Sequence, residues 1–296
     1  MNKPPKKCQI CDSGGVFRFI FSHERWDLYE CNDCAAQFWI PFAEAGRGYY
    51  EGFTHVSHGL SAAQKKTLAA GVHGRALDIG CQTGEFMSAL KSGQCEVWGV
   101  DIDENAVAFA RQHYGLDRAF AADMSEFLKR SDLPAFDLIT AFELIEHIAD
   151  PVGFMRQLEK RLAPGGRIVI STPSRERYFA QSISSDLPPA HVTRWNEKAI
   201  TNMLRGTGLA VAEVRYVDAL KLLAEAFCRR VSFNLVKKAA DFSGGSKTAE
   251  ATTLTKIVHA GAKVKNYTIG GIPGGFFWIL GKLTGKKNGD MVIWIR

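Results

Sequence analysis

Hydrophobic and polar residues along this chain follow two alternating periodicities, which predict strands and helices in turn. Short apolar runs predict buried strands over residues 75–79, 96–101, 118–121, 137–142 and 167–171. Apolar residues at helical spacing predict helices over residues 84–91, 105–113 and 152–162, the last of them stopped by Pro164-Gly165-Gly166. A further helix over 196–205 and strands over 211–217 and 291–296 complete the pattern. Strand–helix alternation of this kind favours a parallel sheet covered on both faces.

Two carboxylates stand at the ends of the first two predicted strands. Asp78 precedes a glycine turn that runs from Gly80 to Gly84, and Asp101 ends the next strand, 21 residues after Gly80. This is about the spacing at which an acidic side chain reaches a nucleoside ribose. The chain is therefore expected to bind a nucleoside cofactor at the carboxyl ends of parallel strands.

The glycine turn argues against a dinucleotide. A pyrophosphate site requires glycine at three positions, but Gln82 and Glu85 occupy the second and third of them. Asp78 would also repel a pyrophosphate, whereas it suits a cofactor that carries an ammonium group and no phosphate. S-adenosylmethionine combines a nucleoside, a sulfonium and an amino acid, and it meets these requirements.

On these residues the chain resembles the class I S-adenosylmethionine-dependent methyltransferases over about residues 60–218 and its last strand. The motifs occur in the family's order: Leu-Asp-Ile-Gly-Cys-Gln-Thr-Gly (77–84), Gly-Val-Asp-Ile-Asp (99–103), Ala-Asp-Met (122–124), Phe-Asp-Leu-Ile-Thr-Ala-Phe-Glu-Leu-Ile-Glu-His-Ile-Ala-Asp-Pro (136–151) and Leu-Ala-Pro-Gly-Gly-Arg-Ile-Val-Ile-Ser-Thr-Pro (162–173). The sequence departs from the family at Gln82, where glycine is usual. The resemblance implies an α/β, Rossmann-like doubly wound seven-stranded sheet, whose last strand inserts antiparallel beside the sixth.

The resemblance also assigns cofactor contacts. It implies that Asp78 favours the methionine ammonium, that Asp101 accepts hydrogen bonds from both ribose hydroxyls, and that Asp123 accepts one from the adenine amino group. The alternative for each acid is a helix cap or a surface charge. The expected cofactor-binding set is Tyr50, Asp78, Gly80, Cys81, Gly84, Asp101, Ile102, Asp123, Met124 and Phe142.

Candidates for a catalytic base lie after the fourth predicted strand and after the fifth. Glu143 ends the fourth strand, and Glu146-His147 is expected to begin the next helix, where the pair could face the transfer site. His191 lies in Pro-Pro-Ala-His-Val-Thr-Arg-Trp (188–195), which is similar to a loop that borders the acceptor site in related bacterial methyltransferases. An imidazole titrates near neutrality and suits a base. Each histidine could instead be structural, and Arg194 could pair with an acidic acceptor or a nearby carboxylate.

Four cysteines near the N-terminus have the spacing of a zinc site. Cys8, Cys11, Cys31 and Cys34 form Cys-x2-Cys-x19-Cys-x2-Cys, with two short strands expected between the pairs. Four thiolates complete a tetrahedral Zn²⁺ and leave no open position, so a structural zinc ribbon is expected. A redox pair or unrelated cysteines are the alternatives. Cys81, Cys95 and Cys228 have no partner at such spacing and are interpreted as buried thiols.

Domain boundaries follow from these motifs. A ribbon over residues 1–45 is expected to precede a methyltransferase core over 46–218 and 290–296, with a basic helical insertion over 219–289. The insertion has 12 Lys/Arg against 3 Asp/Glu, a balance of +9, which leaves −3 for the rest of a chain with net charge +6. It is interpreted as a substrate cap or dimer contact, or as a peripheral membrane contact through 269–287.

Composition places the chain among ordinary globular proteins, with 46% hydrophobic and 23% charged residues. It shows no membrane-spanning run and no signal peptide, so a cytoplasmic location is expected, with membrane association as an alternative. The motifs resemble those of small-molecule methyltransferases related to ubiquinone-pathway O-methyltransferases, which implies a hydroxyl acceptor. An RNA methyltransferase is the alternative enzyme, although only Arg18 and Arg25 are basic between the two cysteine pairs. A non-catalytic cofactor-binding scaffold is the other alternative.

Overall fold

The computed structural model describes residues 2–43, 59–177, 180, 186–218 and 289–296. The chain divides into two compact units, one of residues 1–173, 185–217 and 290–296, the other of residues 174–184 and 218–289. The first unit holds the candidate site residues. The predicted insertion over 219–289 and the aromatic segment with Tyr50 lie almost entirely outside the described residues.

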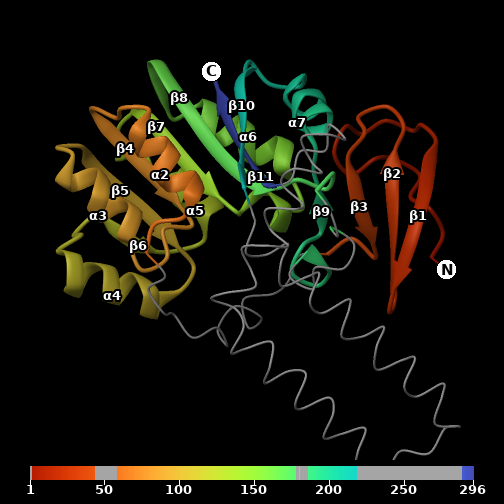
Figure 1. The fold of residues 1–296 in the computed structure, drawn as a ribbon, viewed down its shortest axis with the longest axis horizontal. Coiled ribbons are helices and arrows are strands. Elements are labelled where there is room, and N and C mark those ends of the chain that lie inside the picture. Colours follow the sequence, from red (N-terminus) through yellow and green to blue (C-terminus); the bar gives the residue numbers. More distant parts are fainter. Residues whose placement is uncertain (1, 44–58, 178–179, 181–185, 219–288) are drawn as a thin grey trace, which may run out of the picture. The chain divides into compact units, whose positions relative to one another are not determined.

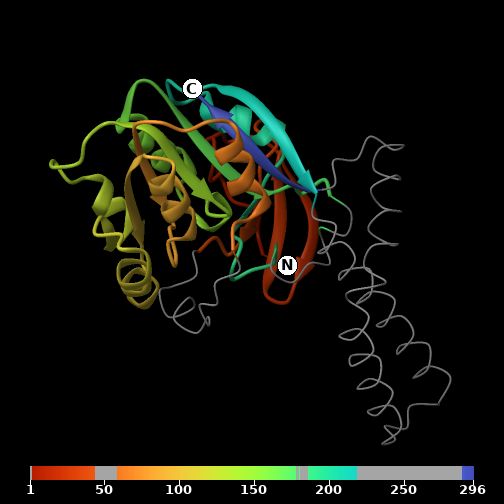
Figure 2. The same cartoon turned by 60° about the vertical axis from the view of Figure 1, so that its left-hand side comes forward.

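A seven-stranded sheet forms the centre of the first unit, in the order β10–β11–β8–β7–β4–β5–β6 (Figure 1). Its strands are β4 (Arg75–Ile79), β5 (Glu96–Asp101), β6 (Ala119–Ala121), β7 (Phe136–Phe142), β8 (Leu162–Pro173), β10 (Val211–Asp218) and β11 (Gly289–Ile295). Strands β8, β7, β4, β5 and β6 are parallel, and β11 runs antiparallel to β8. Figure 2 shows β10 and β11 side by side, so the predicted doubly wound sheet with an inserted last strand is confirmed.

Helices cover both faces of this sheet because its strands alternate apolar side chains between them. On one face, Ala76, Val97, Leu138 and Val169 pack with α2 (Ala62–Ala69), α3 (Glu85–Ser92) and α4 (Glu104–Tyr114). On the other face, Leu77, Val100, Ile139 and Ile168 pack with α5 (Met124–Leu128), α6 (Pro151–Glu159) and α7 (Glu197–Leu204). The parallel strands therefore place all their carboxyl ends along one edge, which is where ligands bind in open α/β sheets.

Two predicted boundaries are wrong, both next to β7. Helix α6 ends at Glu159, and Pro164-Gly165-Gly166 lies inside β8, where the pairing with β7 shifts register. Gly166 fits there because a Cβ atom would lie 2.8 Å from the Phe136 carbonyl oxygen. His147 also does not begin a long helix. It ends a single 3₁₀ turn, Ile145–His147, and α6 begins at Pro151 with Asp150 as its N-cap.

The N-terminal segment folds as a small antiparallel sheet. Its strands β1 (Phe17–His23), β2 (Trp26–Cys31) and β3 (Gln37–Ile40) follow one another, and β9 (Thr193–Arg194) pairs with β3 as the fourth strand. The strand β9 belongs to the segment that carries His191. The pairing of β9 with β3 therefore holds the loop that carries His191 against the ribbon. The sequence pattern did not predict this pairing.

Among the described residues, none of the helices combines the length and the apolar composition needed to cross a membrane.

Candidate functional site

The glycine turn after β4 is bent back onto β5. Gly80 has a φ of +77°, and the amides of Gly80 and Cys81 both donate to the Val100 carbonyl, at 2.8 Å and 3.2 Å. Among the described residues, a Cβ atom on Gly80 would meet only the Leu144 side chain, at 3.8 Å. These contacts leave room beside the Gly80 backbone, and its approach to a cofactor stays a prediction.

Gly84 also has a role in packing. It begins α3 with a φ of +83°, but a Cβ atom there would lie 2.7 Å from Leu116 Cδ1 and 2.8 Å from Ala110 Cβ. The missing side chain thus lets the start of α3 pack against α4 and the residues that follow it. The cofactor contact expected of Gly84 stays a prediction.

Asp101 joins the end of β5 to the glycine turn. Its Oδ2 accepts from the Gln82 amide and its Oδ1 from the Asp103 amide, both at 2.9 Å. Ile102, the next residue, is 36% exposed although it is aliphatic. A fixed carboxylate beside an exposed apolar side chain can take the hydroxyls of a ribose and pack against the base that it carries. Gln82 has a φ of +46°, so the position usual for glycine is still left-handed here.

Asp78 is buried at the end of β4, opposite Thr140 of β7. The Thr140 hydroxyl donates to Asp78 Oδ1 at 2.6 Å. Burial raises the pKa of Asp78 to about 7, the Thr140 hydrogen bond opposes this rise, and the charge of Asp101 adds to it. A cation that reaches this carboxylate would restore its ionised form, which is how a methionine ammonium would act.

The remaining predicted cofactor residues have contacts of their own. Asp123 is the N-cap of α5, where its Oδ1 accepts from the amides of Ser125 and Glu126. The predicted adenine contact is left to Asp123 Oδ2, and it stays a prediction. Cys81 is a buried free thiol, and Met124 packs against the core. Phe142 packs edge-on against Phe86, with ring centroids 5.0 Å apart. Tyr50 lies outside the described residues.

An acidic side chain and two histidines meet where β7 ends. Glu146, His147 and His191 each offer a ligand atom, and these atoms all lie within 4.8 Å of one another. His191 Nε2 lies 4.0 Å from Glu146 Oε1, and the two imidazole rings are perpendicular with centroids 4.7 Å apart. The structure thus brings both predicted base candidates into one group, which we call the acid–histidine cluster.

The cluster is held by backbone contacts between two segments far apart in sequence. The Val192 amide donates to the Glu146 carbonyl at 2.9 Å, and the Thr193 hydroxyl contacts the carbonyls of Ile145 and Glu146 at 3.4 Å. His147 Nδ1 lies 2.8 Å from the Ala190 carbonyl oxygen. These bonds fix the 3₁₀ turn against the loop before β9.

Glu146 is 1% exposed, and neither of its carboxylate oxygens has a hydrogen-bond partner among the described residues. Burial raises its pKa well above the ordinary value, and the charges of Glu143 and Asp186 raise it further. The Thr172 hydroxyl favours the ionised form in part, although its geometry falls short of a hydrogen bond. The sequence places Glu146 beside His147, where the pair could face the transfer site, but it assigns Glu146 no catalytic role of its own.

Glu143 and Arg194 take positions that the sequence left open. Glu143 has a φ of +49°, and its Oε1 accepts from the Ser171 hydroxyl at 2.7 Å, which ties it to the end of β8. Arg194 is 6% exposed, in β9 opposite Gln37. Neither Ser171 nor Thr140 was predicted, because their roles depend on the pairing between parallel strands.

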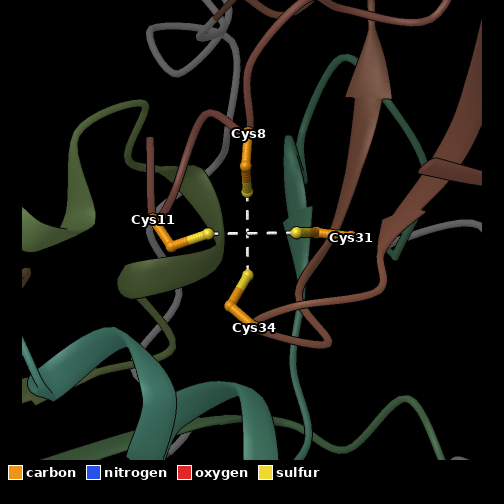
Figure 3. Close-up of side chains that lie close together, drawn as sticks. All are labelled: Cys8, Cys11, Cys31 and Cys34. Carbon is orange, nitrogen blue, oxygen red and sulfur yellow. Dashed lines mark hydrogen bonds between the residues drawn. The ribbon is translucent and has the colours of Figure 1, made fainter. Parts of the chain in front are cut away.

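The four N-terminal cysteines form a compact group (Figure 3). Their sulfur atoms face a common centre, with Cys8 Sγ 3.6 Å from Cys34 Sγ and Cys11 Sγ 3.8 Å from Cys31 Sγ. A tetrahedral Zn²⁺ with bonds of about 2.3 Å holds its sulfurs about 3.8 Å apart. The separation fits structural zinc, and the hydrogen bond with Cys34 lowers the pKa of Cys8 to about 5. Cys81 and Cys95 are free and buried as expected, and Cys228 lies outside the described residues.

Comparison with known proteins decides the family. The family described as "Methyltransferase domain" matches residues 54–214, which is more than half of the chain. The chain belongs to this methyltransferase family. Its glycine turn, Asp101 and the buried Asp78 fit S-adenosylmethionine, so this is an S-adenosylmethionine-dependent enzyme of class I.

Curated relatives of this methyltransferase match part of its length. It is 33% identical over 104 residues to the ubiquinone biosynthesis O-methyltransferase of Alkalilimnicola ehrlichii, covering 34% of this chain and 42% of that protein. It is 29% identical over 153 residues to the enzyme of the same name from Bordetella avium, covering 50% and 61%. The chain therefore spans roughly half the length of the curated relatives it matches.

A SAM-dependent methyltransferase from Geobacter sulfurreducens, in complex with S-adenosyl-L-homocysteine, is 16% identical with a TM-score of 0.48, covering 86% of this chain and 98% of that one.

Proposed function

We propose that this methyltransferase transfers the methyl group of S-adenosylmethionine to a hydroxyl oxygen of a small molecule. The observation that supports this most strongly is the acid–histidine cluster at the end of β7, one strand away from the Asp78 end of β4. Leu144, which precedes the cluster, supplies the side chain nearest to Gly80. A proton-accepting cluster thus adjoins the turn at which the cofactor is expected to bind.

Hydroxyl acceptors are the substrates that need such a cluster. A neutral amine can attack the methyl carbon directly, whereas a hydroxyl oxygen becomes a good nucleophile only as its proton is removed. The partial match to ubiquinone biosynthesis O-methyltransferases favours an aromatic hydroxyl among small-molecule acceptors.

The proposed reaction is an in-line displacement at the methyl carbon. The acceptor oxygen forms a bond to the methyl carbon, the carbon–sulfur bond breaks, and its electron pair stays on sulfur as the thioether of S-adenosylhomocysteine. The hydroxyl proton passes to His191 or His147, the two imidazoles of the cluster. Holding the oxygen and the methyl carbon about 3 Å apart and in line can supply most of the acceleration.

The test is transfer of a radiolabelled methyl group to matched acceptors. Aromatic hydroxyl compounds and their amine analogues are compared, with wild-type protein and the variants His147→Gln and His191→Gln. We expect methylation of hydroxyls, and a fall in kcat of roughly 10²–10⁴-fold for whichever histidine accepts the proton. Binding of S-adenosylhomocysteine should be unchanged. Methylation of amines alone, or full activity in both variants, would contradict the proposal.

A further inference from the structure

Glu146, His147 and His191 have the composition of a metal site as well as of a base. All three ligand atoms lie within 4.8 Å of one another, and two of the three residues are buried. A four-coordinate metal with bonds of about 2.1 Å to nitrogen and oxygen holds its ligand atoms about 3.4 Å apart. The separations within the cluster exceed this spacing by at most about 1.4 Å.

The Glu146 carboxylate is the first independent indication of a cation site. Both its oxygens are buried without a hydrogen-bond partner among the described residues, and burying an unpaired polar group costs free energy. Glu143 and Asp186 add negative potential at the same point instead of relieving it. A bound cation would satisfy the two oxygens and offset both neighbouring charges.

The His147 ring is the second sign. A carbonyl oxygen can only accept, so the 2.8 Å contact with Ala190 makes Nδ1 the protonated nitrogen. In the neutral ring this leaves the Nε2 lone pair as the ligand atom. Metal-binding histidines commonly donate their other N–H to a backbone carbonyl in this way.

We propose that Glu146, His147 and His191 bind a divalent transition-metal ion, in a site separate from the cysteine ribbon. Two imidazoles and one carboxylate favour ions such as Zn²⁺, Fe²⁺, Co²⁺ or Mn²⁺ over Mg²⁺, which prefers oxygen ligands. Three protein ligands leave coordination positions open, as in metal sites that act on a substrate. The backbone bonds of Val192 and Thr193 to the 3₁₀ turn hold the two segments of the site together.

The role of this ion rests on the proposed function, because it concerns a hydroxyl acceptor. An acceptor oxygen bound at an open position has its pKa lowered, as metal-bound water does. If Glu146, His147 and His191 act as ligands, the imidazoles would not take the hydroxyl proton themselves, and it would be released to water. The oxygen forms its bond to the methyl carbon, and the carbon–sulfur electron pair leaves with sulfur as before. An acceptor with two neighbouring oxygens could occupy two coordination positions of the ion and would bind most tightly.

Manganese separates this site from the ribbon, because Mn²⁺ prefers oxygen and nitrogen ligands and thiolate sites select softer ions. The full-length, zinc-loaded chain is titrated with Mn²⁺, and free Mn²⁺ is measured by electron paramagnetic resonance. We expect one Mn²⁺ per chain, and at least tenfold weaker binding in Glu146→Gln and in His191→Gln. The control is His113→Gln, an exposed histidine stacked on Phe109, which should bind Mn²⁺ as the wild type does.

Folding and function are followed in the same samples. Each variant is accepted only if its circular dichroism and its S-adenosylhomocysteine affinity match the wild type. Absence of a Mn²⁺ equivalent in the wild type, or equal Mn²⁺ affinity in all variants, overturns the metal site even if hydroxyl methylation proceeds. Mn²⁺ bound through these residues supports the site, even if a hydroxyl acceptor is never methylated and the proposed function fails.

Discussion

The Thr140 hydroxyl donates a 2.6 Å hydrogen bond to Asp78 Oδ1 across the β4–β7 pair, where the carboxyl group is 2% exposed. One hydroxyl is a weak substitute for water around a carboxylate, so burial still raises the pKa of Asp78 to about 7. The cofactor-free protein therefore holds a carboxyl group that protonates near neutral pH. A cationic ligand would favour the ionised carboxylate instead. The stability of the protein and its binding of such a ligand should therefore both depend on pH.

Asp78→Asn should remove a pH-dependent component of stability. Because folding raises the pKa of this acid, the folded state binds more protons than the unfolded state between about pH 4 and pH 7, and stability falls as pH rises through that window. The full shift corresponds to up to about 4 kcal/mol. Urea unfolding at several pH values should show the fall in wild-type protein and in Asp117→Asn, an exposed control, but not in Asp78→Asn.

Cofactor binding should release a proton through the same group. The ammonium of S-adenosylhomocysteine favours ionised Asp78, so binding at about pH 6 should release up to one proton. Calorimetric titration in buffers of different ionisation enthalpy measures this release directly. Equal apparent enthalpies in all buffers would mean that the ammonium does not reach Asp78.

Asp101→Ala should weaken binding of S-adenosylhomocysteine by at least tenfold. The variant removes the acceptors for a ribose, and it also frees the amides of Gln82 and Asp103 that the carboxylate now holds. Asp103→Ala is the matched control. Asp103 caps α4, so its loss should cost about 1 kcal/mol of stability and leave cofactor affinity close to wild type. Similar affinity losses in both variants would count against the ribose assignment.

Gln82→Gly tests the departure from the family's glycine. Gln82 is left-handed, a conformation that costs a non-glycine residue roughly 1–2 kcal/mol. Replacement by glycine removes this cost, but part of the gain is lost because glycine gives the unfolded chain more conformational freedom. We expect a stability gain of up to about 1 kcal/mol by thermal unfolding. Gln94→Gly is the control, since Gln94 has a φ of +67° after α3. Both variants should gain similar stability, but only Gln82→Gly should alter cofactor affinity.

The core strands and the two carboxylates could be predicted because each depends on local sequence. The range of β4 and that of β5 are identical to the prediction, since each is a buried run that ends at a turn. The contacts around Asp78 and Glu146 could not be predicted. Thr140 reaches Asp78 only because β7 pairs in one register with β4, and His191 reaches Glu146 only because β9 joins the ribbon sheet.

Smaller elements escaped prediction for a related reason. Helix α2 buries only Ala63 and Thr67, so it has too few apolar positions to show a helical period. Strand β9 has two residues, and both are buried where β9 pairs with β3. Two residues are too few to show a strand periodicity in the sequence. The Pro164-Gly165-Gly166 sequence is typical of a segment that ends a helix. In the structure it lies within β8, which pairs with β7 on both sides of it.

Loss of zinc should reach the acid–histidine cluster through the ribbon sheet. Cys34 supplies its carbonyl to the Asn202 side chain of α7 at 3.1 Å, and the Val192 carbonyl accepts from the Trp39 amide of β3 at 3.1 Å. The cysteine group thus supports the loop that presents His191. Cys31→Ser should lower bound zinc from about one ion per chain, which four thiolates hold, toward none. It should also increase hydrogen exchange over residues 190–195.

The matched control is Cys95→Ser, a buried cysteine outside the cysteine group, which should keep its zinc. Zinc is measured by elemental analysis and hydrogen exchange by mass spectrometry. Because Asp78 and Asp101 lie on the central sheet, S-adenosylhomocysteine affinity should change little in Cys31→Ser, while methyl transfer falls with the order of the His191 loop. If exchange over 190–195 stays at the wild-type level after zinc is lost, the ribbon and the cluster are independent, and the pairing of β3 with β9 does not carry the support that we infer.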